Sequence, residues 1–133
     1  MKIAVGTDDG KTVRKGRFCK SRHFMVIEIL NAEVADQSLM DNPHAIIGKE
    51  AEEGEGKIVS VMQLLKDCSL YMGRRFDEDA LEMIAAQGID CISTHYNEID
   101  DAVCFYLDGK LEKFFYYSPD AKEHLPCAQR PYR

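Results

Sequence analysis

The sequence predicts a single α/β domain whose mixed five-stranded sheet is flanked by about three helices. Residues 57–93 predict helix, strand, helix and strand in turn, because apolar residues at helical spacing alternate there with short apolar runs. Residues 1–40 hold strand-like segments separated by turn signals. Strands joined by a helix pair in parallel, whereas strands joined by a short turn pair antiparallel, so together the two halves predict a mixed sheet.

Three strands are expected before residue 41. Residues 2–6 form a short apolar run, and residues 23–30 are strongly β-like in composition. Asn31-Ala32 predicts a hairpin turn into residues 33–40. That last segment is more polar, as is typical of a strand at the edge of a sheet.

A loop and the first helix follow these strands. Pro43 ends the third strand, because proline cannot donate to a β-ladder. Residues 44–56 are rich in Gly and Glu without any period, which predicts a loop. Apolar residues then recur at helical spacing as far as Leu65, and the short run at residues 68–72 has the length of a buried strand.

The second and third helices carry clear end signals. Asp77 is a good N-cap for the second helix, and Gly88 supplies the left-handed residue after its last turn. Residues 89–93 predict the next strand. Residues 98–107 predict a third helix, which ends at Gly109.

The last part of the chain is expected to lie outside this domain. We expect the domain to span residues 1–111 and a C-terminal extension to span residues 112–133. The extension contains the aromatic run at residues 114–117, which we expect to pack against the domain or against a partner. Beyond Pro119 we expect no regular structure.

Composition excludes several classes of protein. The chain has 133 residues, enough for one core but not for two. Its net charge of -6 argues against a general nucleic-acid binder. No apolar run approaches the roughly 20 residues that cross a bilayer, and the first residues do not resemble a signal peptide, so we expect a cytoplasmic protein.

The five cysteines do not predict a disulfide framework. Their number is odd and no Cys-x-x-Cys spacing occurs, which also argues against a structural zinc site. Cys68, Cys91 and Cys104 lie inside apolar runs. We expect these three to be buried thiols of the core.

Positive charge is concentrated in one short segment, residues 11–22, which we call the basic loop. It holds six of the seventeen basic residues: Lys11, Arg14, Lys15, Arg17, Lys20 and Arg22. Such a segment on an acidic protein indicates a local anion-binding site. A solvated loop without a ligand is the alternative.

Several short sequence segments, taken with their order and spacing, resemble the corresponding segments of a known family. They are Met1-Lys2-Ile3-Ala4-Val5, the strand Phe24-Met25-Val26-Ile27-Glu28-Ile29, Asp41-Asn42-Pro43, Leu64-Leu65-Lys66-Asp67-Cys68, Met72-Gly73-Arg74-Arg75-Phe76, Ala86-Gln87-Gly88-Ile89 and Tyr106-Leu107-Asp108-Gly109-Lys110-Leu111. Over residues 1–111 the chain resembles the dinitrogenase iron-molybdenum cofactor biosynthesis family, which includes NifX-like and NafY-like domains and the C-terminal domain of NifB.

The resemblance implies a ribonuclease H-like fold and a function in handling a metal cluster. Members bind or carry iron-molybdenum cofactor, its iron-sulfur precursor or a related molybdenum-containing cluster. By this resemblance we expect a non-enzymatic binding or carrier protein, with a cofactor-biosynthesis protein as a possible partner. We expect no nucleic-acid or membrane partner.

Ligands of open α/β sheets bind at the carboxyl ends of the parallel strands, where the basic loop and two later turns should converge. Arginine donors and backbone N–H groups suit a bulky anionic cluster. The expected cluster-binding residues are Arg17, Cys19, Lys20, Arg22, Gly73, Arg74 and Arg75.

Direct coordination of a soft metal favours thiolate or imidazole. Cys19 is the first candidate, because neighbouring cations should lower the pKa of its thiol. His44, in the predicted loop, and His95, just past a strand, are the other candidate metal ligands.

Two other functions remain open. A metal-dependent hydrolase could use Asp8 and Asp9, although the later strand ends lack further acids. A protein-interaction module without a cluster would use the aromatic run at residues 114–117 as its contact surface. An exposed run would favour that interpretation, and a buried run would weaken it.

Overall fold

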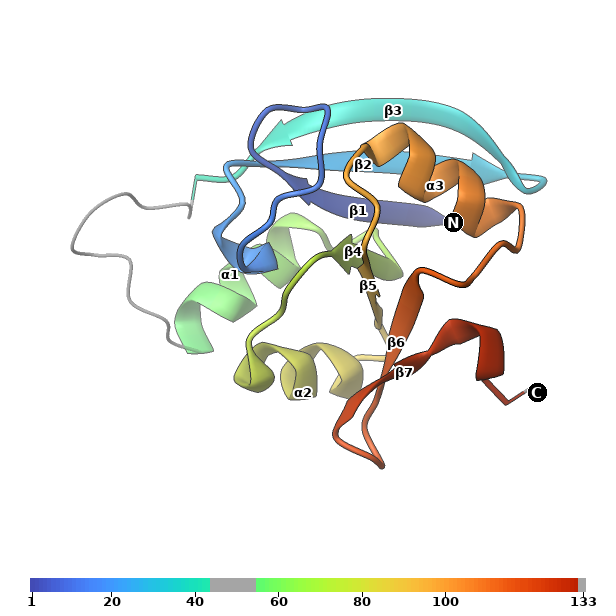
Figure 1. The fold of residues 1–133 in the computed structure, drawn as a ribbon. Helices are drawn as coiled ribbons and strands as arrows, with labels where there is room; N and C mark the ends of the chain where they lie inside the picture. Colours follow the sequence, from blue (N-terminus) through green and yellow to red (C-terminus); the bar gives the residue numbers. More distant parts are fainter. Residues whose placement is uncertain (44–54, 132–133) are drawn as a thin grey trace.

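The computed structural model of the chain describes residues 1–43 and 55–131, which form one mixed sheet with helices on both faces (Figure 1). The strands of these residues are β1 (Lys2–Thr7), β2 (His23–Leu30), β3 (Glu33–Asp41), β4 (Leu70–Gly73), β5 (Asp90–Thr94), β6 (Phe114–Ser118) and β7 (Glu123–Pro126). The helices are α1 (Glu55–Leu64), α2 (Glu78–Ala86) and α3 (Ile99–Leu107), with short 3-10 turns η1 (Phe18–Lys20) and η2 (Cys127–Gln129).

The sheet runs in the order β3-β2-β1-β4-β5-β6-β7. β4 lies parallel to β1 and to β5, whereas all other neighbours are antiparallel. The hairpin between β2 and β3 turns at Asn31 and Ala32, whose φ angles are 54° and 64°. The mixed sheet, the edge position of β3 and the three helices are therefore confirmed.

The expected number of strands was wrong. The described part of the chain has seven strands, because the C-terminal extension adds β6 and β7 to the same sheet. β6 is the aromatic run, and it pairs with β5 from Thr94↔Phe114 to Ile92↔Tyr116. β7 then returns along β6, so the expectation of no regular structure beyond Pro119 was also wrong.

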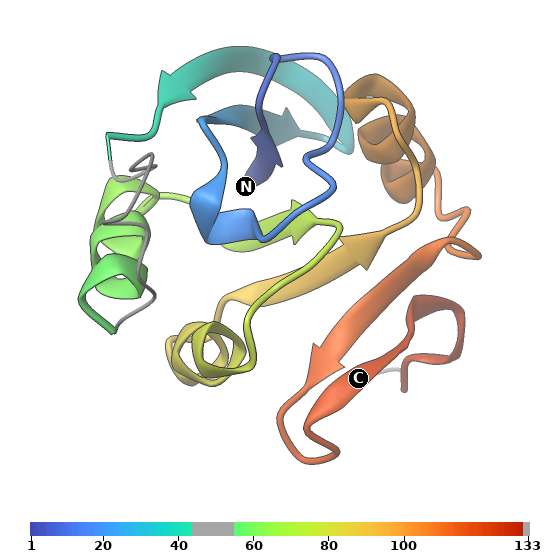
Figure 2. The ribbon, with the colours of Figure 1, turned by 60° about the vertical axis from the view of Figure 1, so that its left-hand side comes forward.

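Two layers of core cover the two faces of the sheet. α1 and α2 pack on one face, around Tyr71 of β4, whereas α3 covers the other face, around Met72 and Phe114 (Figure 2). Because neighbouring strand residues point to opposite faces, Tyr71 and Met72 enter different layers. None of the described helices is long and apolar enough to cross a membrane.

Candidate functional site

The carboxyl edge of the sheet is where β1, β4 and β5 end, at Thr7, Gly73 and Thr94. The basic loop crosses this edge and is hydrogen-bonded to the turn after β4 and to the turn after β5. The Phe18 N–H donates to the Arg75 carbonyl at 2.9 Å, and the Val13 N–H donates to the Asn97 carbonyl at 2.8 Å. The three segments expected at one edge are thus side by side.

The start of the basic loop is shaped by the Asp9 carboxylate. Its Oδ1 accepts hydrogen bonds from the backbone N–H groups of Lys11 and Thr12, both at 2.8 Å. These backbone donors, that of Thr12 first, hold the pKa of Asp9 well below its usual range. Asp9 therefore shapes the loop.

Phe18 anchors the middle of the loop in the core. Its side chain is 1% exposed and stacks on Tyr71 and Phe76, with ring centroids 5.1 Å apart in each pair. Gly73 makes this possible, because a Cβ there would lie 3.2 Å from a Phe18 ring carbon. Gly73 is itself buried beneath the ring, so it contributes to the expected site by admitting Phe18.

Cys19 does not lie where a surface ligand would. Its side chain is 5% exposed and belongs to the core cluster on the α1–α2 face. Cys19 was the first candidate for direct coordination, which needs an accessible thiol, but η1 directs both Phe18 and Cys19 inward. Cys68 and Cys91 are buried as expected, whereas Cys104 is exposed on α3.

Arg74 fastens the turn after β5. Its Nε donates to the Thr94 carbonyl at 2.8 Å, and its Nη2 donates to the Tyr96 carbonyl at 3.2 Å and to Asn97 Oδ1 at 3.0 Å. A guanidinium with several donors in a fixed plane suits this arrangement. Arg74 therefore holds the turn after β5 in place, and these hydrogen bonds already use several of its N–H donors.

The other predicted cations lie around the same edge. Arg17 is half-exposed and pairs through Nε with the Asp77 carboxylate at 2.8 Å. Arg22 and Arg75 are exposed, and Lys20 is partly buried. Arg17 and Arg75 are partners in an isolated parallel bridge, so their side chains start from adjacent backbone.

A cavity of about 460 Å³ lies at the same edge and was not anticipated from the sequence. Its lining residues are Asp8, Thr12, Val13, Arg14, Lys15 and Asn97. The Arg14 guanidinium pairs with Asp8 at 2.7 Å, whereas Lys15 is exposed. The basic character of residues 14 and 15 was the available signal, but only the fold shows that Asn97 closes the cavity.

The structure describes one of the two candidate histidine ligands. His95 is exposed at the end of β5, with its ring 5.1 Å from that of Phe115. His44 lies outside the described residues. Across residues 1–43 and 55–131, no three His, Cys, Asp or Glu side chains are grouped so as to hold a metal ion.

Comparison with known proteins shows both fold and family. The crystal structure of PH0822 matches with a TM-score of 0.66 and 22% identity, over 82% of this chain and 90% of that one. A Thermotoga structure described as a candidate NifB protein matches with a TM-score of 0.60 and 13% identity, over 99% of this chain and 97% of that one. These likenesses show the fold.

A curated relative and a family pattern extend the comparison. An uncharacterized protein of Methanocaldococcus jannaschii is 25% identical over 114 residues, which are 86% of this chain and 92% of that protein. The family described as dinitrogenase iron-molybdenum cofactor matches residues 1–109. The chain therefore belongs to the dinitrogenase iron-molybdenum cofactor family.

Proposed function

We propose that this chain is a non-enzymatic binding or carrier protein for an anionic metal-sulfur cluster, which it holds at the carboxyl edge of the sheet. The cluster would be iron-molybdenum cofactor, its precursor or a related cluster, as family membership suggests. The observation that carries the proposal is the isolated parallel β-bridge between the backbones of Arg17 and Arg75. This β-bridge brings two cationic side chains from separate segments to the same edge.

The cations of this edge fit such a cargo by hydrogen bonding. Exposed Arg22 and Arg75 present guanidinium donors to solvent, and the Lys20 ammonium stands on the same loop. A sulfide-rich anion accepts charge-assisted hydrogen bonds from donors of this kind. Because Cys19 is buried, coordination by its sulfur would require η1 to turn outward. His95, which is exposed, is the better imidazole candidate, and His44 stays a prediction from sequence.

The test is cluster uptake by variants that lose one exposed charge each. Protein purified without oxygen is incubated with iron-sulfur and molybdenum-sulfur species, desalted, and analysed for metals and for charge-transfer absorption. Arg75→Ala should take up several-fold less metal than the unchanged chain. Lys66→Ala removes another exposed charge, two residues beyond the end of α1, and should behave like the unchanged chain. Equal uptake by both variants would refute the proposed site.

The two alternatives have less support from the described residues. Phe114 and Tyr117 are buried, which weakens an interaction surface built on the aromatic run. Asp8 pairs with Arg14 and Asp9 organises the loop, so both carboxylates of the expected hydrolase pair have structural partners. Neither alternative is favoured by a specific observation.

Three further expectations belong to this proposal. The order β3-β2-β1-β4-β5, with β2 antiparallel to β1, supports a ribonuclease H-like arrangement. A cytoplasmic location and a partner from cofactor biosynthesis follow from the proposed cargo. We also retain residues 1–111 as the cargo-binding domain, with residues 112–133 as an extension that completes the sheet.

A further inference from the structure

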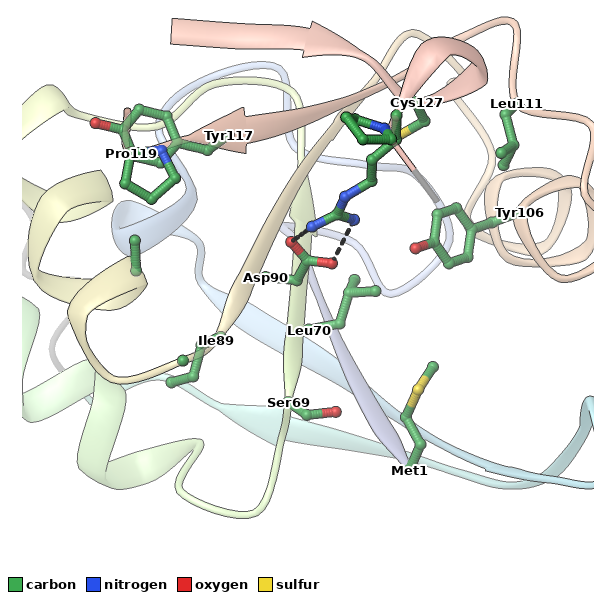
Figure 3. A pocket seen from close by; sticks show the side chains of 14 residues that line it. Met1, Ser69, Leu70, Ile89, Asp90, Tyr106, Leu111, Tyr117, Pro119 and Cys127 are labelled. Carbon is green, nitrogen blue, oxygen red and sulfur yellow. Dashed lines mark hydrogen bonds and ion pairs between the residues drawn. The ribbon is translucent and has the colours of Figure 1, made fainter. Parts of the chain in front are cut away.

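A second cavity lies at the opposite edge of the sheet, where the parallel strands begin. Its volume is about 770 Å³, within the range of roughly 300–1,000 Å³ that small-molecule sites occupy. The strand starts Leu70 and Asp90 form its floor, and Tyr106 of α3 stands at one side (Figure 3). Cys127 and Arg130 of the C-terminal extension close another side.

The polar groups of this cavity are few and fixed. Arg130 makes a bidentate pair with Asp90, at 2.9 and 3.0 Å. Both side chains are about one third exposed, at 31% and 29%. The Arg130 guanidinium also lies 4.2 Å from the centre of the Tyr116 ring. Two opposite charges are therefore held rigidly at the cavity wall, with no net charge between them.

The Tyr106 hydroxyl is an unused donor in this cavity. It points toward Asp90 in Figure 3, yet it makes no hydrogen bond with any other residue that the structure describes. Burial raises the pKa of Tyr106 to about 12, so the hydroxyl keeps its proton near neutral pH. The Ser69 hydroxyl, which is exposed and also lines the cavity, has no partner among these residues either.

The rest of the lining is apolar. Aliphatic, aromatic and proline side chains make up most of the wall: Met1, Leu70, Ile89, Leu111, Tyr117, Pro119 and Pro131. A cavity whose apolar side chains surround a few convergent polar groups is the usual form of a small-molecule site. Desolvating an ionic ligand here would be costly, because Asp90 and Arg130 already neutralise each other.

We infer that this cavity binds a small uncharged aromatic molecule whose amide-type head both donates and accepts hydrogen bonds. The head would accept from Tyr106 and from the guanidinium of Arg130, and it would donate to the Asp90 carboxylate, whose oxygens retain free lone pairs. The flat body would lie among the aromatic and proline side chains. This site is separate from the carboxyl edge, and its occupancy does not depend on a metal cluster.

Three ring compounds of similar shape and different charge test the inference. Benzamide, benzoate and benzylamine are titrated separately into the full chain at neutral pH, and backbone amide signals are followed by NMR. Benzamide should produce saturable shifts at Ile89, Tyr106 and Arg130. The two charged compounds should bind at least about tenfold more weakly. No saturable shift, or equal binding of all three compounds, would overturn the inference.

Two variants locate the binding. Tyr106→Phe removes one hydrogen-bond donor and should weaken benzamide binding by about tenfold, while leaving the thermal midpoint of the free protein unchanged. Ser69→Leu fills part of the cavity and should abolish the shifts. Ser38→Leu makes the same change on the exposed strand β3 and should have no effect. Undiminished binding in Ser69→Leu would place the ligand elsewhere and refute the inference.

Discussion

Phe18 lies on Tyr71 with their ring centroids 5.1 Å apart and an angle of 14° between the rings. This stack makes the middle of the basic loop part of the hydrophobic core. The flanking Arg17 and Lys20 are therefore anchored on either side of a buried segment. A cationic edge built on such an anchor is preorganised, which lowers the entropy lost when an anion binds.

Gly6→Ala should destabilise the protein by roughly 1–3 kcal/mol, in the range of overpacked cores. A Cβ at Gly6 would collide with Ser21 Oγ, which is buried and donates to the Phe18 carbonyl at 2.7 Å. Chemical denaturation measures the loss. Gly16→Ala is the matched control, because the atoms nearest its Cβ, at 3.1–3.3 Å, belong to the partly exposed Arg14 guanidinium and not to a buried side chain. Equal stability of the two variants would contradict this explanation.

Arg74→Lys should cost about 1–3 kcal/mol of unfolding free energy, because an ammonium cannot replace donors directed at Thr94, Tyr96 and Asn97 together. Arg75→Lys changes an exposed side chain and should stay within about 0.5 kcal/mol of the original. Denaturant titration of both variants distinguishes them. A stable Arg74→Lys would show that the turn after β5 does not depend on the guanidinium.

Periodicity and turn chemistry were enough to predict β1 to β5 and the three helices. Asn31 and Ala32 were recognisable as a turn, and Gly88 was recognisable as a helix end with φ of 78°. β6 was expected only as a packed aromatic run, and β7 was missed because the chain beyond Pro119 was expected to be irregular. In the structure Pro119 lies in the connecting turn and Pro126 ends the edge strand β7, where proline is tolerated.

The site was only partly predictable for a different reason. Local sequence showed that the basic loop carries the positive charge, and topology indicated where it should lie. Neither the local sequence nor the topology could show which way each side chain points. Cys19 and Arg17 are two residues apart, yet one is buried and the other pairs with Asp77 at the surface. That difference is set by η1 and by packing against distant Tyr71.

Cys104 should be the first cysteine to react with iodoacetamide in the folded protein at pH 8. It is exposed, whereas burial raises the pKa of Cys68 and of Cys127 to about 11 and so disfavours their reactive thiolates. Intact mass should show one rapid adduct, and peptide mapping should assign it. Cys104→Ser should lose that adduct, and all remaining thiols should react once denaturant is added. Fast labelling of Cys68 would contradict the packing described above.

His124 should make the protein less stable as the pH falls through the mid-acid range. Its ring stacks near Phe76 and Tyr117, and its Nε2 is buried without a hydrogen-bond partner among the described residues. Burial lowers the pKa of His124 below its ordinary value of 6.5, and a hydrogen bond with the Cys91 backbone opposes this shift. Below pH 6.5 the unfolded chain therefore binds a proton that the folded chain excludes until its lower pKa is reached.

Because the unfolded state binds more protons in that window, the unfolding free energy must fall as the pH decreases from 6.5. Above pH 6.5 the ring is neutral in both states, so the titration of His124 no longer makes the unfolding free energy depend on pH. His124→Phe keeps the ring stacking and should flatten the dependence, even though it loses the hydrogen bond at every pH. Denaturation at several pH values measures each slope, and an unchanged slope in His124→Phe would assign the titration to another group.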